Sequence, residues 1–78
     1  MKKQTIQLKL FAVLAKHTPA DADHYPIDPG MTIAQLVHML EIPKKQAKLV
    51  FVNGRRADLA DRINPGDRVG IFPPVGGG

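Results

Sequence analysis

Apolar and polar residues alternate near the start of the chain. The apolar positions of this alternation are Ile6, Leu8 and Leu10. A two-residue period is typical of a strand with one buried face, so we predict a first strand here. Val13 and Leu14 extend the apolar register until His17-Thr18-Pro19 ends it.

A second, short strand is predicted where Tyr25 and Ile27 flank Pro26. Proline has no N–H for a strand ladder, so this strand should lie at a sheet edge. Asp28-Pro29-Gly30 then provides turn residues.

A helix should follow this turn. Thr32 and Gln35 have the spacing of a capping box, and Met31 can pack onto Leu36 as a hydrophobic staple. One apolar stripe is formed by Ile33, Leu36, Val37 and Leu40. Pro43 is expected to stop the helix.

Two more strands are predicted in the second half of the chain. Residues 49–52 are apolar and run into the Asn53-Gly54 turn. A second turn, Asn64-Pro65-Gly66-Asp67, precedes a last strand around Val69 and Ile71. The order strand, strand, helix, strand, strand predicts a single α+β domain with one main helix on one face of the sheet.

Strand alternation leaves two aromatic side chains on the face without a helix. If Val69 and Ile71 point toward the helix, Phe72 points away, and the same parity turns Phe11 away from Leu10. Two large aromatic residues on a bare sheet face suggest a partner-binding surface. The alternative is a loop that folds over them.

Length and composition exclude several classes of function. The chain has 78 residues, which allows one small domain, and it has no Cys, which excludes disulfides, thiolate catalysis and Cys-ligated metals. No apolar run reaches a membrane span, and no signal-peptide pattern is present, so we expect a cytoplasmic protein with no membrane contact. The net charge of +4 favours an acidic partner surface.

No residue set in the sequence predicts catalysis or metal binding. His17, His24 and His38 lack ligand spacing, and no nucleophile–base set is present, so the isolated chain is expected to be no enzyme. The basic residues Lys44, Lys45, Lys48 and the pair Arg55-Arg56 are either solvated or contact an acidic partner. No aromatic residues interleave with them, which argues against nucleic acid.

The chain ends with Pro73-Pro74-Val75-Gly76-Gly77-Gly78. Two prolines stiffen and project the backbone, and three glycines keep it thin. Such a tail can enter a narrow channel of another protein and present a terminal carboxylate. The alternative is a frayed terminus or a remnant of expression.

This tail, together with Gly66-Asp67-Arg68-Val69 and Val52-Asn53-Gly54, resembles the ubiquitin-like sulfur-carrier proteins, MoaD and ThiS. The resemblance covers essentially the whole chain. It implies a β-grasp fold with a mixed sheet of four to five strands over residues 1–72 and a flexible tail over residues 73–78.

The resemblance also implies a chemistry. An E1-like enzyme uses ATP to adenylate the carboxylate of Gly78, and persulfide sulfur displaces AMP to leave a thiocarboxylate. Partner contacts would come from Phe11, Phe72, Pro73, Pro74, Val75, Gly76 and Gly77. The chain itself would bind no cofactor, and the acceptor would be an enzyme such as the molybdopterin synthase large subunit or thiazole synthase.

Several functions stay open within this resemblance. Phe72-Pro73-Pro74-Val75 favours molybdopterin or tungstopterin over thiamin, whereas the third glycine departs from the usual two of molybdopterin carriers. A protein modifier would join the same Gly78 to target lysines. An RNA-binding or regulatory module resembling TGS domains is a third possibility.

Overall fold

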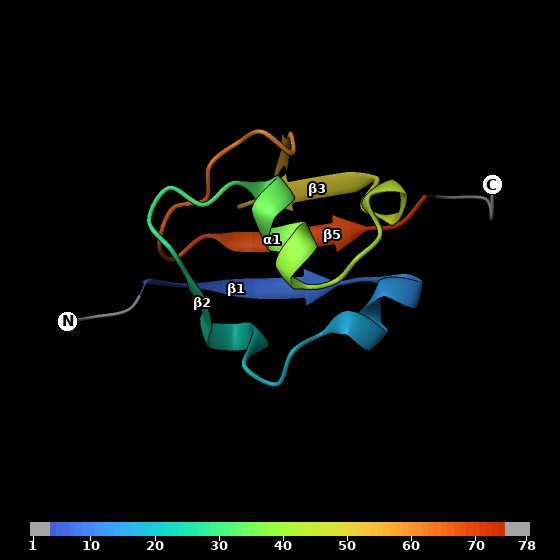
Figure 1. Ribbon diagram of the computed structural model, residues 1–78, viewed down its shortest axis with the longest axis horizontal. Helices are drawn as coiled ribbons and strands as arrows, with labels where there is room; N and C mark the ends of the chain where they lie inside the picture. The colour runs from blue at the N-terminus through green and yellow to red at the C-terminus, as the bar shows by residue number, and fades with distance from the viewer. Residues whose placement is uncertain (1–3, 75–78) are drawn as a thin grey trace.

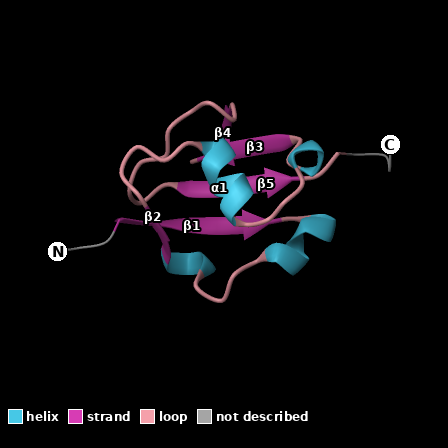
Figure 2. Cartoon of the chain, viewed as in Figure 1, coloured by secondary structure: helices cyan, strands magenta, loops and turns pink. Residues whose placement is uncertain are grey.

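The computed structural model describes residues 4–74, which form a five-stranded sheet with one α-helix in front of it (Figures 1 and 2). The strands are β1 (Gln4–Leu10), β2 (Tyr25–Ile27), β3 (Leu49–Val52), β4 (Arg55–Ala57) and β5 (Arg68–Phe72). The helix is α1 (Ile33–Met39). Short 3₁₀ helices span Ala12–His17, Ala22–His24 and Lys44–Gln46.

The sheet is mixed, with the strand order β2-β1-β5-β3-β4. The central strands β1 and β5 are parallel, whereas the β1–β2, β3–β5 and β3–β4 pairs are antiparallel. This architecture confirms the predicted α+β fold with one main helix. The strand with Pro26 lies at an edge, as its missing N–H requires.

The hydrophobic core lies between α1 and one face of the sheet. Alternate residues of β1 and β5 are buried there, and the helix contributes its apolar stripe. The most deeply buried side chains are Ile6, Leu14, Ile33, Leu36, Val69 and Ile71. The other face of the sheet has no α-helix among the described residues (Figure 1).

The start of α1 follows the sequence prediction. The Thr32 hydroxyl accepts a hydrogen bond from the Gln35 N–H at 3.2 Å, and the Gln35 side chain accepts one from the Thr32 N–H at 2.9 Å. The next two N–H groups, of Ile33 and Ala34, donate to the carbonyls of Asp61 and Leu59. The loop between β4 and β5 therefore satisfies helix donors that would otherwise lack partners.

The end of α1 corrects the sequence prediction, because the helix stops at Met39 and not at Pro43. Glu41 has a left-handed φ of 60°. Its N–H donates to the His38 carbonyl, and the Ile42 N–H donates to the Val37 carbonyl. This is the Schellman pattern that closes many helices, here with Glu41 in the position that usually holds glycine.

A second correction concerns Val13 and Leu14, which do not extend the first strand. Ala12 has a left-handed φ of 54°, which ends the extended backbone and starts the Ala12–His17 3₁₀ helix. In this helix Leu14 is fully buried, whereas Val13 is 62% exposed. The strand β4 was also not predicted as a separate element, because its three residues carry no apolar alternation.

Two segments on which the sequence resemblance rests meet in one hydrogen-bonded unit. Asn53 Nδ2 donates to Asp67 Oδ1 at 2.9 Å, and Asn53 Oδ1 accepts from the Arg68 N–H at 2.9 Å. The other Asp67 oxygen accepts from the Asn64 N–H at 2.8 Å. These bonds join the β3–β4 turn to the start of β5, so Asp67 has a structural role, as its turn position predicts.

We expect Asp67→Ala to lower the free energy of unfolding by about 1.5–3 kcal/mol, because the donors of Asn53 and Asn64 lose their acceptor in a site where Asp67 is only 8% exposed. Thermal or urea unfolding measures this loss. Asp23→Ala is the matched control, because Asp23 is exposed and its removal should change stability by less than about 0.5 kcal/mol. Equal stability of the two variants would contradict the structural role.

Candidate docking face

Three phenylalanine rings gather on the sheet face opposite α1, and we call Phe11, Phe51 and Phe72 the phenylalanine cluster. The rings of Phe11 and Phe72 stack in parallel, with centroids 4.1 Å apart and an interplanar angle of 3°. Phe51 meets Phe72 edge to face, with centroids 5.7 Å apart. Phe72 is therefore the central ring of the cluster.

Strand alternation places Phe72 on this face. Its neighbour in β5, Ile71, is fully buried against the helix, so the Phe72 side chain points to the opposite side. The ring is half-buried because Phe11 and Phe51 contact it. The structure thus places Phe72 on the sheet face without an α-helix, as strand alternation predicts. Its role in partner binding remains a prediction.

Phe11 reaches the same face from just beyond the end of β1. Its backbone is still extended, with φ −107° and ψ 155°, and its N–H donates to the Ile71 carbonyl at 3.2 Å. The alternation of β1 therefore continues for one residue past the strand. Ala12 then turns the chain away through its left-handed φ, which leaves the Phe11 ring 38% exposed.

Phe51 is a member of this cluster that the sequence analysis missed. The signal was present, because Val50 and Phe51 are neighbours in one strand and must point to opposite faces. In the structure Val50 is buried, and Phe51 lies opposite Gly70 in the register of β3 and β5. All four residues of Leu49–Val52 are apolar, and this conceals the alternation, because either alternate pair could face the core.

Gly70 lies in the sheet next to the rings of Phe11 and Phe72. A β-carbon at this position would stand 3.4 Å from Phe11 Cε2 and 3.8 Å from Phe72 Cε1. These distances are van der Waals contacts, so a larger side chain would occupy the space of the rings. A methyl group at this position would just fit beside the rings, whereas a longer side chain would displace them.

The predicted tail begins directly beside the phenylalanine cluster. Phe72 is the last residue of β5, and its carbonyl accepts a hydrogen bond from the Lys48 N–H at 3.0 Å. Pro73 is half-buried and Pro74 is exposed. Val75, Gly76, Gly77 and Gly78, which carry most of the predicted tail chemistry, lie outside the described residues.

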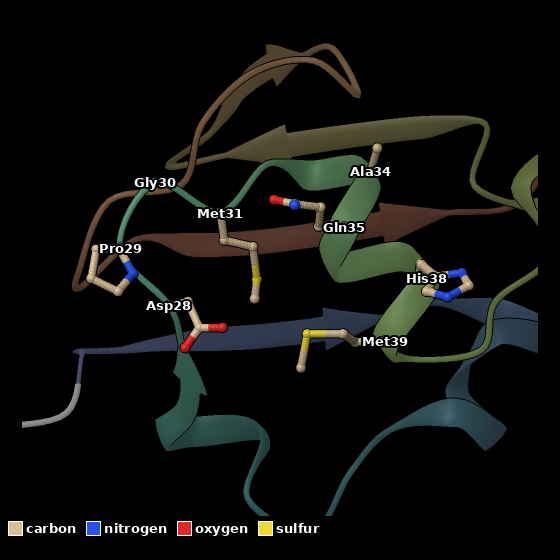
Figure 3. Close-up of a pocket in the computed structure, with 8 residues that line it drawn as sticks. All are labelled: Asp28, Pro29, Gly30, Met31, Ala34, Gln35, His38 and Met39. Atoms are coloured by element: carbon tan, nitrogen blue, oxygen red, sulfur yellow. The ribbon is translucent and has the colours of Figure 1, made fainter.

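A groove on the other side of the molecule runs along α1 (Figure 3). Its lining includes Met31, Met39 and the Asp28-Pro29-Gly30 turn. Figure 3 shows Asp28 and His38 at opposite ends, with Met39 between them, so they do not form an acid–base pair.

Within residues 4–74, no group of three His, Asp or Glu side chains could hold a metal ion. None of the helices in that range has the length and apolar character needed to cross a membrane.

Comparison with known proteins shows the family. The model of the ThiS family matches residues 8–78, which is most of the chain. The protein belongs to the ThiS family. No curated protein matches the sequence.

Solved structures share the fold of this ThiS-family chain. A Pyrococcus furiosus protein assigned as molybdopterin converting factor, subunit 1, superposes with a TM-score of 0.68 at 22% identity, covering 92% of this chain and 99% of that one. SAMP1 from Haloferax volcanii has a TM-score of 0.64 at 26% identity, with 95% and 99% covered. A second structure of that small archaeal modifier protein 1 has a TM-score of 0.67 at 24% identity, with 92% and 99% covered.

These findings confirm the β-grasp, ubiquitin-like fold and the resemblance to MoaD and ThiS. They support a small carrier or modifier protein. In such a ThiS-family protein, the phenylalanine cluster and the tail that follows it are the features suited to contact with a partner.

Proposed function

We propose that this protein is a sulfur carrier that holds sulfur as a thiocarboxylate on Gly78. The observation that supports this most is the position of the phenylalanine cluster, whose central residue, Phe72, is followed directly by the tail. An enzyme that docks on the exposed rings is thereby held next to the chain that leads to Gly78. The tail can then enter the enzyme's active site without rearrangement of the domain.

The carboxylate of Gly78 is a poor electrophile and needs activation. In the proposed sequence, one of its oxygens attacks the α-phosphorus of ATP on an E1-like enzyme, and pyrophosphate leaves. The outer sulfur of a persulfide then attacks the acyl carbon and displaces AMP, which gives an acyl disulfide. A thiol cleaves its S–S bond, so the thiocarboxylate leaves with one sulfur and the thiol ends in a disulfide.

This sulfur would pass to an accepting enzyme in cofactor biosynthesis. The tail sequence and the fold likeness to a molybdopterin converting factor subunit favour a molybdopterin or tungstopterin pathway, with thiamin second. The chain contributes its terminal group and its docking face, and the partners contribute ATP binding and catalysis. It would count as the small subunit of a sulfurtransferase.

Intact-mass measurement of the protein from its own cells tests this proposal. A fraction of the chain should be heavier by the mass difference between sulfur and oxygen, and fragmentation should place that difference at the C-terminal residue. A thiol-alkylating reagent should modify the thiocarboxylate of this fraction and leave the rest of the protein unmodified, since the chain has no Cys. If no such species forms with its activating enzyme, ATP and a persulfide donor, the proposal is wrong.

A protein modifier is the second candidate, and the 26% identity to SAMP1 favours it. Activation would be the same, but a lysine amine would displace AMP and leave an isopeptide bond on Gly78. Peptide mapping of target lysines distinguishes the two functions, because a modifier leaves branched peptides and a carrier leaves none.

A further inference from the structure

The charged side chains within the sheet are all positive. The five strands contain Lys9, Arg55, Arg56 and Arg68, and no Asp or Glu. The chain as a whole has seven acidic residues, so acidic residues are confined to helices, turns and loops. The sheet therefore presents a cationic surface to whatever approaches it.

Strand register places three of these cations on the face of the phenylalanine cluster. Lys9 pairs with Gly70, Gly70 with Phe51, and Phe51 with Arg56, so all four lie in one row across the sheet. Arg68 is two residues from Gly70 in β5 and faces the same side. A shallow hollow on this face is lined by Lys9 and Arg68 together with the three rings.

The face is polarised along the strands. Phe11 and Phe72 occupy the end from which the tail leaves, and Arg68 lies at the other end of β5. Phe72 lies four residue steps along β5 from Arg68, or about 13 Å at about 3.3 Å per residue. We call Lys9, Arg56 and Arg68 the basic rim. An approaching partner meets Phe11 and Phe72 nearest the tail. The next row across the sheet has Phe51 in its interior, with Lys9 at one end and Arg56 at the other, and Arg68 lies beyond that row.

We infer that the partner enzyme carries carboxylates opposite the basic rim, which flank its apolar docking pocket and continue on the side away from the channel for the tail. The inference rests on the proposed function, since it takes the partner to be the enzyme that receives the tail. Exposed rim charges act mainly on the rate of encounter, whereas buried aromatic anchors act on dissociation. The two sets of side chains would thus have separate roles: the cations orient the partner, and the rings retain it.

Single-stranded RNA would also meet cations and aromatic rings on this sheet, but the ring geometry argues for a protein. Bases stack on free ring faces. Here Phe11 and Phe72 stack on each other at 4.1 Å, and Phe51 packs its ring against Phe72 at 5.7 Å. Mutual stacking covers one face of Phe11 and one face of Phe72, so fewer ring faces are free for bases and the cluster suits a protein pocket better.

Association kinetics of the full chain with its activating enzyme test the inference. We expect the double variant Lys9→Glu/Arg68→Glu to associate at least about tenfold more slowly at low salt, with a dissociation rate changed by less than about threefold. The difference should shrink at about 1 M salt, where the Debye length is about 3 Å. The matched control is Lys16→Glu/Arg62→Glu, which changes net charge equally on exposed residues outside the strands.

An equal loss in the control would show that net charge alone steers the encounter, and it would overturn the inference. An unchanged association rate in the rim variant would do the same. RNA oligonucleotide binding that is lost in the rim variant would assign the face to nucleic acid instead.

The proposed function is tested separately with saturating activating enzyme: the native chain and the rim variant should both be adenylated. If the native chain is adenylated but its association rate does not depend on salt, only the acidic partner surface is refuted. If the native chain is not adenylated, both the sulfur-carrier function and the acidic partner surface are refuted.

Discussion

Appending one bulky residue, such as Trp, after Gly78 should abolish adenylation of this protein by its activating enzyme. The added residue moves the carboxylate by about one residue, or about 3.5 Å, and places a side chain where the channel for the tail should be narrow. Thiocarboxylate formation should fall with adenylation, since it follows from the same activated carboxyl group. ATP–pyrophosphate exchange and intact mass measure the two steps.

The matched control for this variant is the same chain after a carboxypeptidase has removed the added Trp, which should restore adenylation. Folding should be unaffected, within about 0.5 kcal/mol, because the buried core of the described part of the chain, residues 4–74, lies between Ile6 and Ile71. Gly77→Val should impair the same step more mildly, through bulk and restricted backbone angles. If the chain with the added Trp is activated as well as the native one, the C-terminus is not the reacting site.

Local sequence patterns predicted most of the strands and the start of the helix. Ile6, Leu8 and Leu10 show the two-residue period because one face of β1 is buried and the other is not. The capping box of Thr32 and Gln35 is present as its spacing predicts. These features depend on neighbours a few residues apart, which is why the sequence alone could show them.

Other elements depend on backbone states that the residue type does not reveal. Ala12 and Glu41 both adopt a left-handed φ, a conformation that a non-glycine residue rarely takes. Each one ends an element earlier than expected, β1 in the first case and α1 in the second. Leu14 and Ile42, which follow these two residues, are buried in the core, so tertiary packing favours both turns and local propensities do not reveal them.

The candidate site was predictable in part. Parity alone placed Phe11 and Phe72 on the uncovered face, but their parallel stacking over Gly70 depends on strand pairing across β1 and β5. That pairing joins residues about 60 positions apart in the chain and has no local signal. The basic rim was hidden for the same reason, since Lys9 and Arg68 become neighbours only in the sheet.

We expect Phe72→Ala to weaken binding to the activating enzyme by about 1–3 kcal/mol, which corresponds to about 5- to 150-fold in Kd, because Phe72 is the central ring of the exposed cluster. Its cost to the free energy of unfolding should be about 1–2 kcal/mol, from the two ring contacts that are lost. A fully buried Phe would cost about 3–5 kcal/mol. Phe11→Ala should cost less stability, since Phe11 has one ring neighbour and is 38% exposed.

Thermal unfolding and titration calorimetry on the same samples separate binding from folding. Met39→Ala is the matched control, because Met39 is a large apolar residue that is 49% exposed on the α1 side of the molecule. It should leave affinity for the activating enzyme unchanged. Collapse of the fold in Phe72→Ala and Phe11→Ala would mean that these rings belong to the core. Equal losses of affinity in Phe72→Ala and Met39→Ala would mean that docking does not depend on the uncovered face. Loss of affinity confined to the two phenylalanine variants would identify this face as the surface that brings the tail to its enzyme.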